Sequence, residues 1–134
     1  MVLAYGVERA TRDVDALFEP HGVVSEEARA VGAELGLPPW WLNDQASAYL
    51  ARVADDGASP VFDHPNLRVH ACSARHLLAM KALAARPHDL ADLRVLVAHL
   101  GLRSATEVFD VVAAVFPDEA ISGRKRLLVE DLFA

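Results

Sequence analysis

The alternation of side-chain types near the start of the chain predicts a β-strand over residues 11–18. Side chains two residues apart in a strand point to the same face, so we expect Asp13 and Asp15 to lie side by side. Two like charges held together cost free energy unless a positive group lies between them. A divalent metal ion is the usual group of that kind.

Two helices are expected after this strand. In the segment SEEARAVGAELGL, Ser25 is suited to cap the start of a helix and Gly36 to end it. Prolines suit the first turn of a helix, and the apolar residues after Pro39 continue at helical spacing as far as Val53. The segment ADDGASP then has the composition of a turn or linker.

The rest of the chain predicts a β-hairpin followed by helices. The segment PVFDHPNLRVHACS contains two short strands around a DHPN turn. From Ser73 onward the pattern is helical, with breaks at Pro87, Gly101 and Pro117, and SGRKRLLVEDLF forms a last helix.

This order of elements, strand, helices, hairpin and helices, is typical of an α+β protein. We expect one small, mixed or mostly antiparallel sheet in residues 1–72 and a helical part in residues 73–134. At 134 residues, of which 53% are hydrophobic, the chain is most simply a single domain with its own core.

Composition and charge narrow the class of protein. No apolar run approaches the ~20 residues that span a bilayer, and the start MVLAYGVERATRD lacks the basic and long apolar regions of a signal peptide. The lone Cys72 excludes an internal disulfide and fits a reducing compartment, so we expect a cytoplasmic protein without membrane contact. The net charge of −6 argues against a broad nucleic-acid-binding surface, although GRKRLL supplies a local basic patch.

The aspartate pair is the first candidate for chemistry. Magnesium sites in phosphoryl transfer use one or two carboxylates together with phosphate oxygens and water, so Asp13 and Asp15 suffice for the protein's share. The alternative is an exposed strand face on which both charges are merely solvated. Arg9 and Thr11 favour the phosphate interpretation, because a basic residue and a hydroxyl beside the pair fit phosphate chemistry.

Lys81 is the second candidate. At about 100° per residue it falls in the centre of an apolar arc of its expected helix. A lysine centred on a buried stripe either extends its amine to solvent or meets an anion. The apolar arc consists of Leu77, Leu78, Ala84 and Ala85, and the opposite arc of Arg75, Ala79 and Arg86.

Asp89 and Asp92 are the third candidate. They are three residues apart and therefore share one face of a helix. Acidic residues in a first helical turn commonly stabilise the helix dipole and its unpaired N–H groups, and that interpretation competes with a direct catalytic role.

The remaining candidates carry weaker signals. His70, Cys72 and His76 could supply three ligands of a zinc site, but no fourth ligand has a suitable spacing, and Cys72 also fits a core position. Trp40 and Trp41 could stack on a nucleobase or pack in the core. The sequence has no HExxH motif, no phosphate-binding glycine loop and no Gly-x-Ser-x-Gly elbow.

Three segments taken in order resemble a known family. They are YGVERATRDVDALF (residues 5–18), WWLND (residues 40–44) and LRVHACSARHLLAMKALAARPHDLADL (residues 67–93). Together they resemble the minimal nucleotidyltransferases of the DNA polymerase β superfamily that occur in bacterial abortive-infection and toxin–antitoxin systems.

The resemblance implies a small sheet of the nucleotidyltransferase type and a magnesium-dependent transfer of a nucleotide from an NTP to a hydroxyl of an RNA, such as a tRNA, or of a protein. It implies that Asp13 and Asp15 are the metal ligands and that Arg9 and Thr11 flank the phosphates. Lys81 would neutralise the leaving pyrophosphate. An antitoxin would be the partner.

Two further site residues follow from the same resemblance, because Asp89 and Asp92 match acidic positions in the helical segment of the family. They would orient Lys81 or the acceptor.

One departure from the family concerns the start of the chain. The family places a Gly-Gly or Gly-Ser pair at the end of a first strand, where backbone N–H groups grip the triphosphate at a helix N-terminus. Here MVLAYG resembles the remainder of that helix, and the sequence shows neither the first strand nor the glycine pair: either the start was assigned too late or the chain is a shortened relative. Loss of the strand would expose a sheet edge and favour a homodimer or a partner strand.

Three functions are therefore consistent with the sequence. The first is an active nucleotidyltransferase. The second is a catalytically inactive, truncated relative that acts as a binding or regulatory subunit. The third is an α+β scaffold in which the aspartates are solvated and Lys81 reaches solvent.

Overall fold

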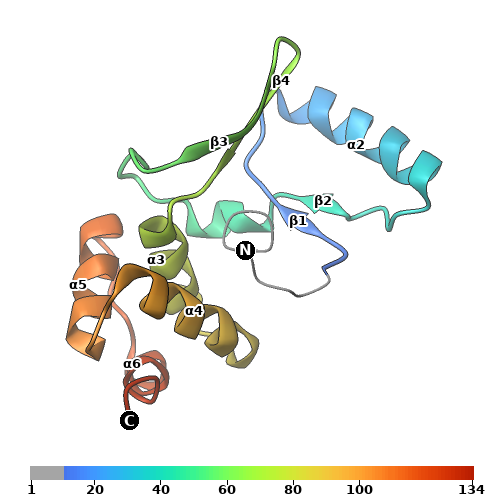
Figure 1. The fold of residues 1–134 in the computed structure, drawn as a ribbon. Helices are drawn as coiled ribbons and strands as arrows, with labels where there is room; N and C mark the ends of the chain where they lie inside the picture. The colour runs from blue at the N-terminus through green and yellow to red at the C-terminus, as the bar shows by residue number, and fades with distance from the viewer. Residues whose placement is uncertain (1–10) are drawn as a thin grey trace. The chain divides into compact units, whose positions relative to one another are not determined.

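The computed structural model describes residues 11–134, and the chain divides into two compact units, Met1–Leu50 and Ala51–Ala134. Each unit has its own pair of strands and its own helical elements (Figure 1). The α+β class is confirmed, but the described strands form two separate two-stranded sheets, one parallel and one antiparallel, instead of one mixed sheet. Arg9 lies outside the described residues.

The first unit is built on a strand–helix–strand motif. Strands β1 (Val14–Asp15) and β2 (Leu42–Asn43) pair in parallel, with Val14 opposite Leu42 and Asp15 opposite Asn43. Parallel strands need a crossover connection, and helix α2 (His21–Leu35) lies in this one. The short 3-10 helix η1 (Gln45–Tyr49) follows β2.

Trp41, the residue before β2, attaches the chain after α2 to that helix. Its indole Nε1–H donates a hydrogen bond of 2.8 Å to the main-chain oxygen of Ala28 in α2. Gly32, one turn further along the helix, is buried beneath the ring, and a Cβ atom there would come within 2.9 Å of the Trp41 Cδ1 atom. A glycine is therefore needed at position 32 for the indole to approach the helix this closely.

The predicted strand over residues 11–18 is wrong in its length, because β1 covers Val14–Asp15. The Thr11 hydroxyl lies 3.1 Å from the main-chain oxygen of Asp13 and 3.4 Å from its main-chain nitrogen. Such local bonds from a side chain to the backbone compete with strand pairing.

The helix predictions for this unit are partly wrong. Helix α2 begins at His21, four residues before the expected cap Ser25, and follows Pro20 in extended conformation; its end at Gly36, with φ of +66°, is confirmed. The expected helix after Pro39 is not formed. Leu42 and Asn43 instead pair with β1, so tertiary pairing overrides the helical spacing of the apolar residues.

The second unit agrees closely with the sequence prediction. Strands β3 (Ser59–His64) and β4 (Leu67–Ala71) form the expected antiparallel hairpin. They are followed by α3 (Ala74–Ala84), the short η2 (Pro87–Asp89), α4 (Leu90–Leu100), α5 (Ala105–Val115) and α6 (Gly123–Glu130). None of the helices within residues 11–134 combines the length and the apolar character that crossing a membrane requires.

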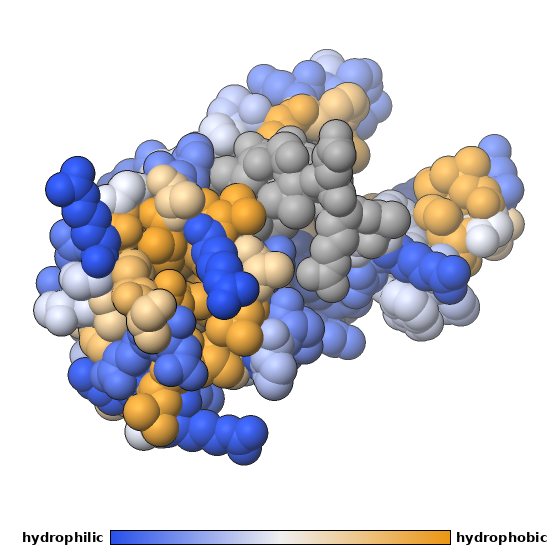
Figure 2. Space-filling view, turned by 60° about the horizontal axis from the view of Figure 1, so that its bottom comes forward, coloured by the Kyte–Doolittle hydropathy of each residue, from blue (hydrophilic) through white to orange (hydrophobic). Residues whose placement is uncertain are grey.

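The core of the second unit lies between its helices. Helix α3 packs against α4, α5 and α6, and its alanines let the neighbouring helices approach. Apolar surface also remains visible among hydrophilic residues (Figure 2), as is usual for folded proteins. The fully buried core side chains are Leu78, Ala79 and Ala82 of α3, Leu93 and Leu96 of α4, Val108 and Val112 of α5 and Val129 of α6.

The predicted apolar arc of α3 is wrong. Ala79, placed by the prediction on the polar side, is fully buried, whereas Leu77 and Ala84 are only half-buried. Alanine is compatible with either side of a helix, and here Ala74, Ala79 and Ala82 all face the core. Lys81 therefore lies at the border of the packed face instead of at its centre.

Candidate functional site

The first unit contains an open pocket with a volume of about 670 Å³. Its lining comes from two stretches of the chain, the four consecutive residues Thr11 to Val14 and the turn after α2 together with Trp41. The turn contributes Gly36, Leu37 and Pro38. The pocket therefore brings Thr11 and Asp13, two of the predicted site residues, to one place.

Thr11 holds the Asp13 carboxylate at this pocket. The Thr11 hydroxyl lies 2.8 Å from Asp13 Oδ1 and 3.1 Å from the Asp13 main-chain oxygen. Both residues are exposed, so the second carboxylate oxygen is accessible to a ligand. Arg12 lines the same pocket. Arg12 is not among the site residues predicted from the sequence, although it lies between two of them, Thr11 and Asp13.

Asp15 has a different setting. It lies in β1 opposite Asn43, is exposed, and does not belong to the pocket lining. Two carboxylates with one residue between them are a donor set that suits Mg²⁺, which prefers oxygen ligands and completes its shell with phosphate and water. Residues 11–134 contain no cluster of three or more side chains that could hold a metal without a substrate.

Lys81 forms an ion cluster within the second unit. Its Nζ atom lies 2.9 Å from Asp89 Oδ1 and 2.8 Å from Asp92 Oδ2. Asp89 and Asp92 are 6% and 9% exposed, so this is a nearly buried triad with one net negative charge. Of the two interpretations of Lys81, contact with an anion is the one observed.

The electrostatics of the triad favour the charged lysine. Burial by itself lowers the pKa of Lys81, but the hydrogen bonds to Asp92 and Asp89 and their negative charges outweigh it, and the pKa is raised. Asp89 Oδ2 also accepts the Arg86 main-chain N–H at 3.3 Å. The triad therefore ties α3 to the start of α4.

The structure thus brings Lys81 together with Asp89 and Asp92, whereas the resemblance left open whether these aspartates orient Lys81 or the acceptor. Asp13 and Asp15 belong to the first unit, and the three residues of the triad belong to the second. The catalytic role of all five residues stays a prediction.

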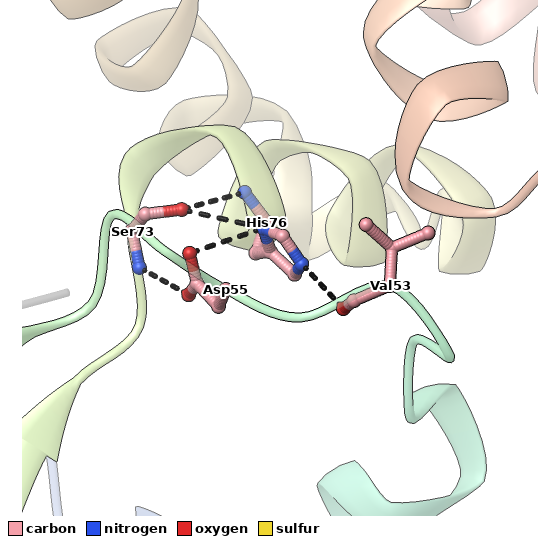
Figure 3. A network of polar contacts seen from close by, with 4 residues as sticks. All are labelled: Val53, Asp55, Ser73 and His76. Atoms are coloured by element: carbon pink, nitrogen blue, oxygen red, sulfur yellow. Dashed lines mark hydrogen bonds and ion pairs between the residues drawn. The ribbon is translucent and has the colours of Figure 1, made fainter.

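A second polar network joins the segment before the hairpin to the start of α3 (Figure 3). His76 Nδ1 lies 3.2 Å from Asp55 Oδ1 and 3.4 Å from Ser73 Oγ, and His76 Nε2 lies 3.1 Å from the main-chain oxygen of Val53. Asp55 Oδ2 accepts the Ser73 main-chain N–H at 2.8 Å. The side chains of Asp55 and His76 are 20% and 13% exposed.

This network is not arranged as a nucleophilic triad, although it contains serine, histidine and aspartate. In such a triad the serine and the acid contact opposite nitrogens of the imidazole ring. Here Ser73 and Asp55 both face Nδ1, while Nε2 faces a carbonyl oxygen. These contacts attach residues 53–55 to the start of helix α3, which is a structural role.

The contacts of His76 also argue against the alternative of a zinc site at His70, Cys72 and His76. Both ring nitrogens of His76 face protein groups, and residues 11–134 hold no metal-binding group that includes His70, Cys72 and His76. Burial and the adjacent Asp55 carboxylate, which accepts a hydrogen bond from the thiol, raise the pKa of Cys72 to about 12. The thiol is thus protonated at neutral pH and is a poor metal ligand or nucleophile.

Comparison with known proteins gives no relative: no family model, no curated protein and no solved structure matches the chain.

Proposed function

We propose that this chain is a nucleotidyltransferase-like protein that transfers a nucleotide from an NTP to a hydroxyl of an RNA or a protein within a toxin–antitoxin or phage-defence system. One observation supports the proposal most: Thr11, Arg12 and Asp13 line a single open pocket. A carboxylate for magnesium, a cation and a hydroxyl are the groups that a triphosphate needs, and the proposal adds a cytoplasmic setting and an antitoxin partner.

The chemistry is an in-line displacement at the α-phosphorus of the NTP. The acceptor hydroxyl oxygen forms a bond to that phosphorus, the bond to the oxygen bridging to the β-phosphate breaks, pyrophosphate leaves, and the hydroxyl proton passes to water. Bound magnesium, held by Asp13 and Asp15, would neutralise phosphate charge. The protein's task is to position the phosphates and stabilise their charge.

The side chains divide this task. Thr11 orients the Asp13 carboxylate through their 2.8 Å hydrogen bond. Arg12 supplies a guanidinium group, whose planar set of N–H donors matches phosphate oxygens. Lys81, to which the family resemblance assigns neutralisation of phosphate charge, is held within the second unit by Asp89 and Asp92.

A second candidate function is a binding subunit without turnover. It is favoured by the Lys81 triad, in which two nearly buried carboxylates already neutralise the ammonium. In this function the pocket binds nucleotide, but no label reaches an acceptor.

The test is transfer of label from an α-labelled NTP to RNA or to protein in the presence of Mg²⁺. We expect transfer by the wild-type chain and at least a hundredfold loss in Asp13→Asn. Asp63→Asn is the matched control, because Asp63 is an exposed aspartate of the hairpin. Equal transfer by Asp13→Asn and wild type would contradict the proposed site, and nucleotide binding without transfer would select the binding subunit.

A further inference from the structure

The pocket of the first unit is lined by two stretches of chain with different chemistry. The first stretch includes the polar and charged residues Thr11, Arg12 and Asp13. The second, the apolar wall, includes Leu37, Pro38 and Trp41. A ligand that contacts both stretches would therefore join a charged part to an apolar or aromatic part.

The indole of Trp41 is held rigidly at this wall. Its only N–H group already donates to the Ala28 oxygen at 2.8 Å, and Gly32 lies close against its Cδ1 edge. The Trp41 main-chain N–H also donates to the Pro38 oxygen at 3.0 Å. A side chain fixed in this way offers π surface without further loss of conformational entropy on binding.

Trp40 does not share this setting. It is 54% exposed and is absent from the pocket lining, whereas Trp41 is half-buried and lines it. The two interpretations of the tryptophan pair, nucleobase contact and packing, therefore both apply to Trp41, and Trp40 serves as an internal control.

We propose that the pocket takes a nucleoside triphosphate with its base packed on Trp41, Leu37 and Pro38 and its phosphates beside Arg12, Thr11 and Asp13. This inference rests on the proposed function and adds how the substrate is recognised. The side chains of the apolar wall have no unused hydrogen-bonding group, because the indole N–H is already bonded. The base is thus bound through its ring face, which every base possesses, so recognition tolerates all four bases.

The chain's two tryptophans allow a direct test with the full-length protein. In Trp40→Phe, Trp41 is the only tryptophan, and in Trp41→Phe, Trp40 is the only one, so excitation selective for tryptophan reports on each in turn. We expect Mg·NTP to quench the fluorescence of Trp40→Phe and to leave that of Trp41→Phe unchanged. Magnesium tripolyphosphate, which lacks a base, should quench neither.

Affinity measured by calorimetry completes the test. Base stacking on an aromatic side chain predicts that Mg·NTP binds about tenfold more tightly than magnesium tripolyphosphate, with the four NTPs within about fivefold of one another. Trp41→Leu should remove most of the tenfold difference, and Trp40→Leu should keep it. If Trp41→Leu does not fold, the quenching of Trp41 fluorescence in Trp40→Phe shows whether the base packs on Trp41.

The outcomes separate this inference from the function on which it rests. Equal affinity for NTP and tripolyphosphate, both weakened by Asp13→Asn, would overturn the base site and leave the phosphate site standing. Discrimination among the four bases by more than a hundredfold would also overturn it. Absence of binding by either compound would overturn the proposed function itself.

Discussion

At the scale of single residues, the Lys81 triad shows how a charge is kept near a helical core. Two carboxylates hold the ammonium at 2.8 and 2.9 Å, and neither aspartate is more than 9% exposed. A buried ion pair is weak evidence for stability, but removing one member leaves uncompensated charge in a poorly solvated place. Lys81 is therefore the residue of the triad whose loss should be most costly.

We predict that Lys81→Met destabilises the protein by about 3 kcal/mol, because Asp89 and Asp92 would then lose the ammonium group that contacts both of them. Urea unfolding measures the effect. Arg75→Met on the same helix is the control, since Arg75 is exposed and should change stability by less than about 0.5 kcal/mol. Equal effects of the two substitutions would show that the triad makes no special contribution.

The Asp55 network makes a separate prediction about acid stability. Burial by itself raises the pKa of Asp55, but hydrogen bonds from Ser73 and the nearby His76 outweigh it and hold the pKa below its ordinary value of 3.8. A carboxyl whose native pKa is depressed stabilises the fold fully above the ordinary value, and this contribution is lost as the pH falls through the native value.

We expect Asp55→Asn to lower stability at pH 7 by about 1–2 kcal/mol and to flatten its fall below about pH 4. Urea midpoints at pH 7 and pH 3 measure this. Asp56→Asn is the matched control, because Asp56 is the exposed neighbour in the same segment. If stability fell equally between pH 7 and pH 3 in Asp55→Asn and in the wild type, the stabilising role of the Asp55 network would be refuted.

These two clusters differ in how far sequence could predict them. The spacing of Asp89 and Asp92 predicted that they share a helical face, and the family resemblance offered Lys81 or the acceptor as the group that they orient. Asp55 is 18 residues from Ser73 and 21 from His76, and it lies in a segment without periodicity. Only the folded backbone brings Asp55 to the start of α3.

At the scale of secondary-structure elements, the contact between α2 and Trp41 organises the first unit. The indole reaches the Ala28 oxygen over a helix position that has no side chain, Gly32. The pocket lining depends on this contact because Trp41 is part of it.

Two glycines in the same helix test this packing. In Gly32→Ala the new Cβ would lie 2.9 Å from Trp41 Cδ1, and we expect a net loss of about 1–2 kcal/mol despite the better helix propensity of alanine. Gly22→Ala has nothing within 4 Å and should stabilise α2 by about 0.5 kcal/mol. Urea unfolding compares them, and a neutral or stabilising Gly32→Ala would contradict the packing described.

Local signals explain which elements sequence predicted well. Ser73 and Ser104 cap α3 and α5 through their hydroxyls, and Gly101 ends α4 with φ of +66°. Where no such signal existed, periodicity misled. The apolar spacing after Pro39 predicted a helix, but Leu42 and Asn43 instead form strand β2, which pairs with β1. Strand pairing across 28 residues leaves no trace in local spacing.

At the scale of the whole molecule, the predicted site residues are divided between the two units. The first holds the pocket with Thr11, Arg12 and Asp13, and the second holds the Lys81 triad. The candidate site residues were found from sequence because charged residues in an apolar context are conspicuous. Sequence could not show that Arg12 and Trp41 line the same pocket, since their proximity comes from the parallel pairing of β1 with β2.

The central claim is that this pocket binds a magnesium–nucleotide complex through Asp13. The most direct measurement is the shift of the unfolding midpoint when Mg·NTP is added to the wild type and to Asp13→Asn. Ligand at a hundred times its Kd should stabilise the wild type by about 2.7 kcal/mol, while the variant shifts by much less. A wild-type midpoint that does not move, or an equal shift in the variant, would contradict the claim.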